Sequence, residues 1–166
     1  MPEMDKLVRK NIRVKGYDYS TPGYYFITIC TQNKEKILSD IVGTGLPDGP
    51  QALLTDAGYI VKNQLDEMSA FYKNIILEKY VVMPNHIHLL LQITGTYEPT
   101  EQHTPANAQI SKFIGTFKRF TNRKIGRNIW QARSHDHVIR GEADYEQIWL
   151  YIETNPARWE KDCFYS

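Results

Sequence analysis

The distribution of apolar residues along the chain predicts three well-defined strands. Aromatic and β-branched residues fill Tyr24–Cys30, and apolar residues dominate Asn74–Met83 and His86–Ile93. Such runs are typical of strands that are at least half buried. Pro84 and Asn85 form a turn signal between the last two runs, so we expect His86–Ile93 to return beside Asn74–Met83.

Three other segments place apolar residues at helical intervals. The first helix begins after Thr55, which is expected to be its N-cap, and the second continues to about Asn122. The third begins near Gly141 and ends at Thr154–Asn155, because Pro156 disfavours helical geometry at the residue before it. The residues expected to face the core are Ala57, Ile60, Val61, Leu65, Met68, Ile110, Phe113, Ile114, Phe117, Phe120, Tyr145, Ile148, Trp149 and Ile152.

The remaining segments are expected to be loops or short strands. Residues 1–15 are polar and predict a flexible arm, while Gly43–Pro50 and Thr94–Ala108 have the composition of loops. Ile129–Arg140 is mixed, with strand character near its end. The resulting order β-α-β-β-α-β-α predicts an α+β fold, in which helices cover an antiparallel sheet.

Length and composition are those of one globular domain over residues 1–166. Hydrophobic residues make up 42% and charged residues 23% of the chain. No run approaches the ~18 apolar residues of a membrane span, and the charged N-terminal stretch has no apolar core typical of a signal peptide. The two cysteines, Cys30 and Cys163, form no disulfide framework. These features predict a cytoplasmic protein that does not interact with membranes.

The formal net charge of +1 hides a basic segment that contains a single acidic residue, Asp136. A concentration of positive charge indicates a polyanion as partner, and Phe113 and Trp130 are candidates for stacking on unpaired bases. A solvated helix face is the alternative interpretation. The basic residues are Lys112, Lys118, Arg119, Arg123, Lys124, Arg127, Arg133 and Arg140.

His86 and His88 are the first candidates for chemistry. Alternate side chains of a strand point to the same face, so the two imidazoles are expected side by side, about 6.6 Å apart at the backbone. This spacing allows both to bind one metal ion, although two histidines packed beside a turn are an equally simple explanation. Imidazole ligands alone favour zinc or a later transition metal.

Several motifs resemble the single-tyrosine HUH transposases, especially the group of REP-associated tyrosine transposases. The strand entry reads MPNHIHLLL, in which His-hydrophobic-His follows Pro-Asn. Downstream, in the family's order, stand Trp-Gln, His-x-Ile-Arg and finally YIETNPARW at Tyr151–Trp159. The resemblance extends from about Val14 to Trp159. It implies a ferredoxin-like HUH endonuclease fold, related to that of RNA-recognition domains.

The resemblance also implies roles for individual residues. His86 and His88 would be metal ligands, Tyr151 the nucleophile, and Asn155 the polar residue that completes the metal site. Residues four apart lie on one helix face, so Tyr151 and Asn155 can face the histidine strand together. The carboxamide oxygen of Asn155 is a hard ligand, which favours Mg²⁺ or Mn²⁺ over zinc. Without the resemblance, Tyr151 is one of eleven tyrosines and would be a core-edge residue.

The implied function is a metal-dependent endonuclease and strand transferase acting on single-stranded DNA through a 5′-phosphotyrosine intermediate. The DNA is expected to form a hairpin, gripped by the basic segment, and a homodimer is a further possibility. The alternative is a non-catalytic module that binds single-stranded or hairpin nucleic acid. For His135 and His137, which are also spaced by two, a structural role or a DNA contact is expected rather than a second metal site.

Overall fold

A computed structural model describes residues 22–43, 49–94 and 109–165. Four of its strands form one antiparallel sheet. β1 (Gly23–Cys30) and β5 (His86–Ile93) pair along their whole length at its centre. β4 (Ile75–Val82) pairs with the outer side of β5, and β6 (His135–Val138) pairs with the outer side of β1. The spatial order is β4-β5-β1-β6.

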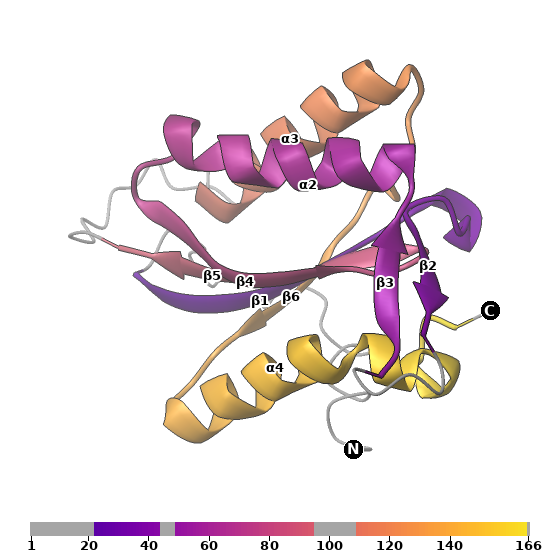
Figure 1. The fold of residues 1–166 in the computed structure, drawn as a ribbon. Coiled ribbons are helices and arrows are strands. Elements are labelled where there is room, and N and C mark those ends of the chain that lie inside the picture. The colour runs from indigo at the N-terminus through magenta and orange to yellow at the C-terminus, as the bar shows by residue number, and fades with distance from the viewer. Residues whose placement is uncertain (1–21, 44–48, 95–108, 166) are drawn as a thin grey trace.

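Helices cover both faces of this sheet (Figure 1). α2 (Asp56–Phe71) precedes β4, and α3 (Gln109–Ile125) connects β5 to β6; the two helices lie side by side on one face. α4 (Glu142–Thr154) lies on the other face. The sheet with α2 and α3 has the βαββαβ order of ferredoxin-like domains, which confirms the predicted α+β fold.

The alternation of side chains along the strands separates two apolar clusters. Ile87, Leu89 and Leu91 of β5 join the large core under α2 and α3. Phe26 of β1 and Leu90 of β5 join a smaller cluster under α4. His86 and His88 share the face of Leu90, so the candidate site lies in the layer between the sheet and α4.

The main elements agree with the sequence analysis. The Thr55 side chain accepts a hydrogen bond from the Gly58 amide at 3.1 Å, which confirms it as the N-cap of α2. β5 has the predicted bounds, and α3 extends to Ile125 rather than Asn122. Five residues that were expected to face the core are only half buried: Ala57, Ile60, Phe120, Tyr145 and Trp149.

The turn between β6 and α4 sets the position of the helix that faces the site. Gly141 precedes α4 with φ of 91°, a left-handed conformation that favours glycine. The Asp144 carboxylate accepts a hydrogen bond from the Arg140 amide at 2.9 Å and lies 2.8 Å from Nε2 of His137. One carboxylate in the first turn therefore connects the helix to the strand before it.

Two structural features were not predicted. β2 (Ser39–Val42) and β3 (Gln51–Leu54) form a separate hairpin, and residues 44–48 of the expected loop Gly43–Pro50 between them lie outside the described residues. A 3-10 segment, η3 (Pro156–Lys161), follows α4 directly. The expected arm at residues 1–15 and nearly all of the expected loop at 94–108 lie outside the described residues.

Within the described ranges, no helix is long and apolar enough to cross a membrane.

Candidate metal centre and active site

His86 and His88 meet at the end of β5, on the face that α4 covers. Their Nε2 atoms are 3.1 Å apart, and both side chains are fully buried. The ring centroids lie 4.5 Å from each other. The prediction that alternation would bring the two imidazoles side by side is confirmed.

Asn85 determines the tautomer of His86. Its Nδ2 donates to the Phe164 carbonyl at 2.8 Å, so its Oδ1 is directed at Nδ1 of His86, also at 2.8 Å. An amide oxygen only accepts hydrogen bonds, so His86 carries its proton on Nδ1. Its Nε2 therefore presents a lone pair to the space between the two histidines.

Thr28 contacts the other histidine from the neighbouring strand. Its Oγ1 lies 2.7 Å from Nδ1 of His88, and the two residues are partners in the β1–β5 register. A hydroxyl both donates and accepts, so this hydrogen bond persists in either tautomer of His88. With the proton on Nδ1, His88 also directs a lone pair from Nε2 at the same space. Hydrogen bonds of this kind orient metal-binding histidines in general.

Burial keeps both imidazoles neutral. Desolvation lowers the pKa of His86 to about 3, against a weaker opposing effect of the Asn155 amide. Desolvation also lowers the pKa of His88 well below its ordinary value, with smaller contributions from His86 and His135. A metal ion binds the neutral form of histidine, so neither ligand has to lose a proton at neutral pH.

α4 brings Tyr151 and Asn155 to the histidines, as the sequence analysis expected. The ring of Tyr151 lies 5.2 Å from that of His88 and 6.0 Å from that of Phe26, and its side chain is 4% exposed. Asn155 is the C-cap residue of α4 and is also buried. While His86 is neutral, Oδ1 of Asn155 accepts no hydrogen bond from another described residue. A buried amide oxygen without a donor suits a cation.

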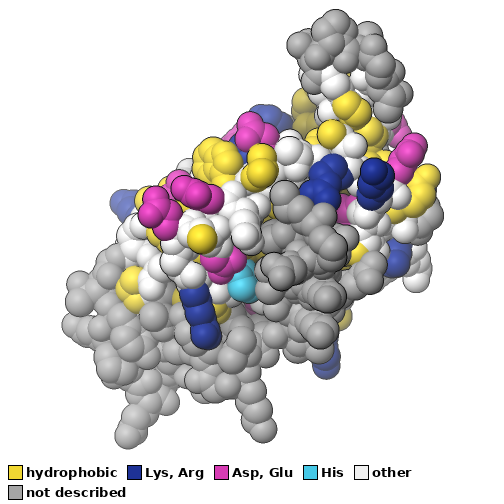
Figure 2. Space-filling model, turned by 90° about the horizontal axis from the view of Figure 1, so that it is seen from below, with side chains coloured by type: hydrophobic (Ala, Val, Ile, Leu, Met, Phe, Trp, Pro, Cys, Tyr) yellow, Lys and Arg dark blue, Asp and Glu magenta, His cyan; other side chains and the backbone are white. Residues whose placement is uncertain are grey.

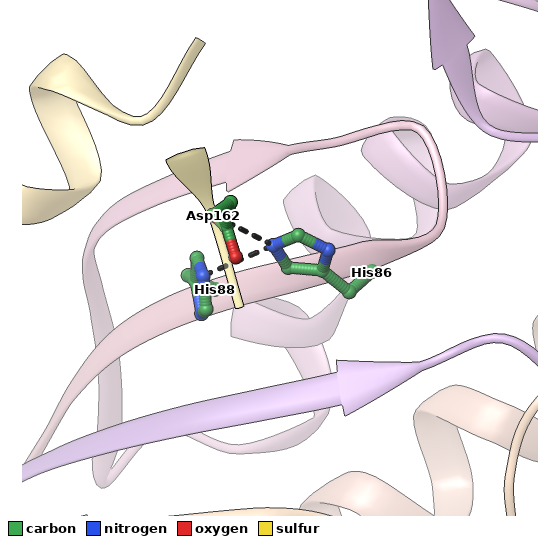
Figure 3. A group of neighbouring side chains, drawn as sticks. All are labelled: His86, His88 and Asp162. Carbon is green, nitrogen blue, oxygen red and sulfur yellow. Dashed lines mark hydrogen bonds and ion pairs between the residues drawn. The ribbon is translucent and has the colours of Figure 1, made fainter. Parts of the chain in front are cut away.

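A third group, Asp162, joins the two histidines from the segment after η3. Its carboxylate points at them (Figure 3), with Oδ2 3.9 Å from Nε2 of His86. The candidate ligand atoms of the three residues lie within 4.8 Å of one another, and all three residues are buried. Two imidazoles with one carboxylate form a ligand set that fits a divalent cation.

The sequence analysis did not identify Asp162. The resemblance ended near Trp159, and a single acidic residue close to Cys163 has no spacing that relates it to a histidine pair on a distant strand. Phe164 was missed for the same reason. Its ring centroid lies 4.5 Å from that of His86 and 5.9 Å from that of His88. Residues 162–164 therefore cover the site.

No family model matches the chain. An uncharacterised protein of Haemophilus influenzae is 32% identical, over 95% of this chain and 93% of that protein. A candidate REP-associated tyrosine transposase of the same organism is 26% identical, over 85% of this chain and 74% of that protein. The solved structure of a REP-associated tyrosine transposase bound to a REP hairpin shares the fold, with a TM-score of 0.62 at 20% identity over 89% of this chain and 74% of that one. The 32% identity places the chain in one family with the uncharacterised Haemophilus influenzae protein, and the chain is similar to REP-associated tyrosine transposases in sequence and in fold.

The Trp-Gln motif that contributed to this resemblance has a structural role here. Trp130 is 1% exposed and donates from its indole to Oγ1 of Thr121 at 2.8 Å. Gln131 pairs with the end of β1, through its amide to the Cys30 carbonyl and through its side chain to the Thr31 carbonyl. Trp130 and the equally buried Phe113 have no exposed face, so the interpretation that they stack on bases is wrong.

The basic residues of this family member are spread over three places. Lys112, Lys118, Arg119, Arg123 and Lys124 lie on α3, Arg127 follows that helix, and Arg133 and Arg140 flank β6. α3 covers the face of the sheet opposite to the histidines. Seen from the side of α4, the described basic side chains are scattered among acidic ones (Figure 2).

Three of these basic side chains have partners within the protein. Lys118 donates to the Gln131 carbonyl at 2.8 Å, Lys124 pairs with Glu67 at 3.3 Å, and Arg127 pairs with Glu35 at 2.8 Å. By contrast, Arg119 and Arg123 lie over the ring of Phe120 and are exposed. Contact with nucleic acid stays a prediction for the set as a whole.

His135 and His137 point to the same side of the sheet as His86 and His88. His135 pairs in register with Thr28, on the side of β1 away from His88. His137 is engaged by Asp144, which supports a structural role. Among the described residues, the group that brings potential ligand atoms together is that of His86, His88 and Asp162, so no second centre forms around His135.

Proposed function

We propose that this protein is a metal-dependent endonuclease and strand transferase that acts on single-stranded DNA through a 5′-phosphotyrosine intermediate. One observation carries the proposal. A pair of buried imidazoles and a tyrosine ring 5.2 Å from one of them come from a strand and a helix that are distant in the chain. Neither packing nor solubility requires this combination, whereas phosphodiester transfer uses both a metal site and a nucleophile.

The ligand set supports Mg²⁺ or Mn²⁺ as the cofactor. His86 and His88 would hold the ion through Nε2, and Asn155 and Asp162 would contribute oxygen ligands. Oxygen donors are preferred by these hard cations, so the choice of metal rests on Asn155 and Asp162 rather than on the two imidazoles. When bound, such an ion polarises a phosphate oxygen and stabilises the negative charge that develops there.

Tyr151 would act as the nucleophile. Its Oη forms a bond to phosphorus while the bond from phosphorus to the 3′ oxygen breaks, and the phenolic proton is released during the attack. The leaving oxygen takes a proton and becomes a free 3′-hydroxyl. The new phosphotyrosine retains the energy of the broken phosphodiester, so a second strand end can be joined without ATP.

DNA has to reach a site that is closed in this structure. Both histidines are fully buried, Tyr151 is 4% exposed, and Phe164 packs against both imidazoles. A phosphate can reach the histidines only after Phe164 moves away. The proposed substrate is a single strand next to a hairpin, and the related structure bound to a REP hairpin supports this choice.

The test is covalent capture of labelled DNA. Hairpin oligonucleotides with unpaired flanks are mixed with the protein and Mn²⁺ or Mg²⁺, denatured and separated by electrophoresis. We expect a denaturation-resistant adduct with the wild type and none with Tyr151→Phe. Tyr145→Phe, which changes another tyrosine of α4, is the matched control and should retain the adduct. An adduct that persists in Tyr151→Phe would contradict the assignment of the nucleophile.

The closed site also favours a second candidate, a module that binds hairpin DNA without cutting it. Phe164 packs against both histidines, so the closed arrangement has no space for a phosphate beside them. In that case DNA binding would be independent of metal, and no adduct would form with any flanked hairpin. The capture experiment therefore separates the two candidates.

A further inference from the structure

A hollow of about 570 Å³ lies next to the candidate site, between the β2–β3 hairpin and η3. Figure 1 shows the hairpin standing beside this C-terminal segment. One wall is formed by Ser39, Asp40 and Ile41 of β2, and the other by η3 and Tyr165. The volume is within the range of pockets that hold small ligands, and the hollow is separate from the space between the histidines.

An aromatic pair connects the hollow to the metal site. Trp159 lies between the two, with its ring centroid 6.0 Å from that of His86 and 5.1 Å from that of Tyr165. Trp159 is buried, whereas Tyr165 is 46% exposed and lines the hollow. The exposed ring of Tyr165 is therefore only two ring contacts away from a proposed metal ligand.

Basic groups line the same hollow as this exposed ring. Lys36 lies with Nζ 5.0 Å from the ring centroid of Tyr165 and 5.9 Å from that of Trp159. Arg158 and Lys161 also line the hollow, and neither forms an ion pair with another described residue. Asp40 and Glu160 are the acidic groups of the lining, so three cationic groups face two anionic ones.

We propose that this hollow binds an unpaired nucleotide of the DNA strand that flanks the scissile phosphate. The base would stack on Tyr165, and its phosphates would be met by Lys36, Arg158 and Lys161. An aromatic platform surrounded by basic side chains is the general means by which proteins hold single-stranded nucleic acid. The inference rests on the proposed function, because it takes the strand at the metal site to continue past Trp159.

The geometry favours a nucleotide over a free anion such as inorganic phosphate. A phosphate alone would use the cationic groups but leave the exposed ring of Tyr165 unused. A duplex would present no free base faces to that ring. An unpaired nucleotide uses both features and reaches the site through a continuous strand.

The test measures DNA binding by the full chain carrying Tyr151→Phe, so that no cleavage occurs. Three fluorescent probes share one hairpin: one is blunt, one has about eight unpaired nucleotides on each side, and one has abasic flanks with the same number of phosphates. We expect the base-bearing probe to bind roughly tenfold more tightly than the abasic probe at about 0.15 M salt. Tyr165→Ala should remove this difference, and Tyr165→Phe should keep it.

Two further variants separate stacking from charge and from general effects on the surface. Lys161→Glu should weaken binding of both flanked probes while affinity for the blunt hairpin stays the same. Tyr59→Ala changes a tyrosine of α2 that is 52% exposed on the opposite layer, and should leave all three affinities unchanged. The proposal is overturned if Tyr165→Ala keeps the parent's preference for the base-bearing probe over the abasic probe.

The same probes distinguish failure of this inference from failure of the proposed function. If wild-type protein forms the covalent adduct but the preference for bases over abasic flanks does not depend on Tyr165, the hollow is not the nucleotide site. If that preference depends on Tyr165 and no adduct forms with any hairpin, the hollow is confirmed as a binding site and the endonuclease proposal fails.

Discussion

The two faces of the four-stranded sheet receive alternate residues of the same strands, and they differ in what they bury. Beneath α2 and α3, β5 contributes Ile87, Leu89 and Leu91 to a continuous apolar core. Beneath α4, the same strand buries His86 and His88. Leu90 is the residue of this strand that joins the smaller apolar cluster there. One face is built for stability, and the other accepts buried polar groups that are fixed by specific hydrogen bonds.

This difference shows how a small domain can hold a polar site without losing its core. Burying an imidazole is unfavourable unless its polar atoms are satisfied. Here Asn85 and Thr28 supply the hydrogen bonds for Nδ1 of the two histidines. Because the large core lies on the other side of the sheet, changes in the polar layer are expected to affect chemistry more than folding. The following variants test that separation.

The largest effect is expected for His88→Ala. Removing one imidazole takes away a proposed ligand and the stabilisation of phosphate charge, which is worth several kcal/mol, so adduct formation should fall at least ~1,000-fold. Thermal unfolding and circular dichroism should show that the variant remains folded. Adduct formation at the wild-type rate in this variant would exclude the histidine pair from the reaction.

Leu89→Ala is the matched change on the other face, at the next residue of β5. Leu89 is fully buried in the large core, so the cavity should lower the free energy of unfolding by ~3 kcal/mol in urea titrations. The remaining folded protein should bind Mn²⁺ with an affinity within about twofold of the wild type. A large loss of metal affinity in the folded variant would show that the two faces are coupled.

A smaller effect, on metal affinity, is expected when either of the two proposed oxygen ligands is removed, and its size should differ between them. Asp162→Ala removes a formal negative charge next to the ion and is expected to weaken Mn²⁺ binding by ~10- to 100-fold, measured by calorimetry. Asn155→Ala removes a neutral donor and should weaken it by about tenfold or less. Glu153→Ala, an exposed acid on α4, is the control and should have no effect. If only Asn155→Ala weakens binding, the carboxylate is not a ligand.

Much of this architecture was predictable from local patterns. The bounds of β5, the N-cap Thr55 and the presence of α3 follow from periodicity and capping, because these signals depend on residues close together in the chain, although α3 ends at Ile125 rather than at the expected Asn122. The β2–β3 hairpin was missed because four-residue strands contain too little alternation to stand out. Asp162 was missed because proximity to His86 depends on how η3 folds back after α4.

The basic segment shows that nearness in sequence does not by itself give nearness in space. A contiguous run from Lys112 to Arg140 crosses from α3, on the apolar-core side, to β6 at the edge of the sheet. Part of its charge is already used in contacts with Glu67, Glu35 and the Gln131 carbonyl. A count of charged residues along the chain shows neither where in the fold they lie nor which of them are already paired.

The sequence by itself determined which residues share a face. Period-two alternation aligned His86 with His88, and helical spacing aligned Tyr151 with Asn155, because both relations are set by local backbone geometry. Only the tertiary structure decided that the two faces meet, that Asn85 and Thr28 orient the imidazoles, and that Asp162 and Phe164 cover them. Those contacts arise from packing of α4 and η3 on the sheet, and packing between distant segments leaves no spacing signal in the chain.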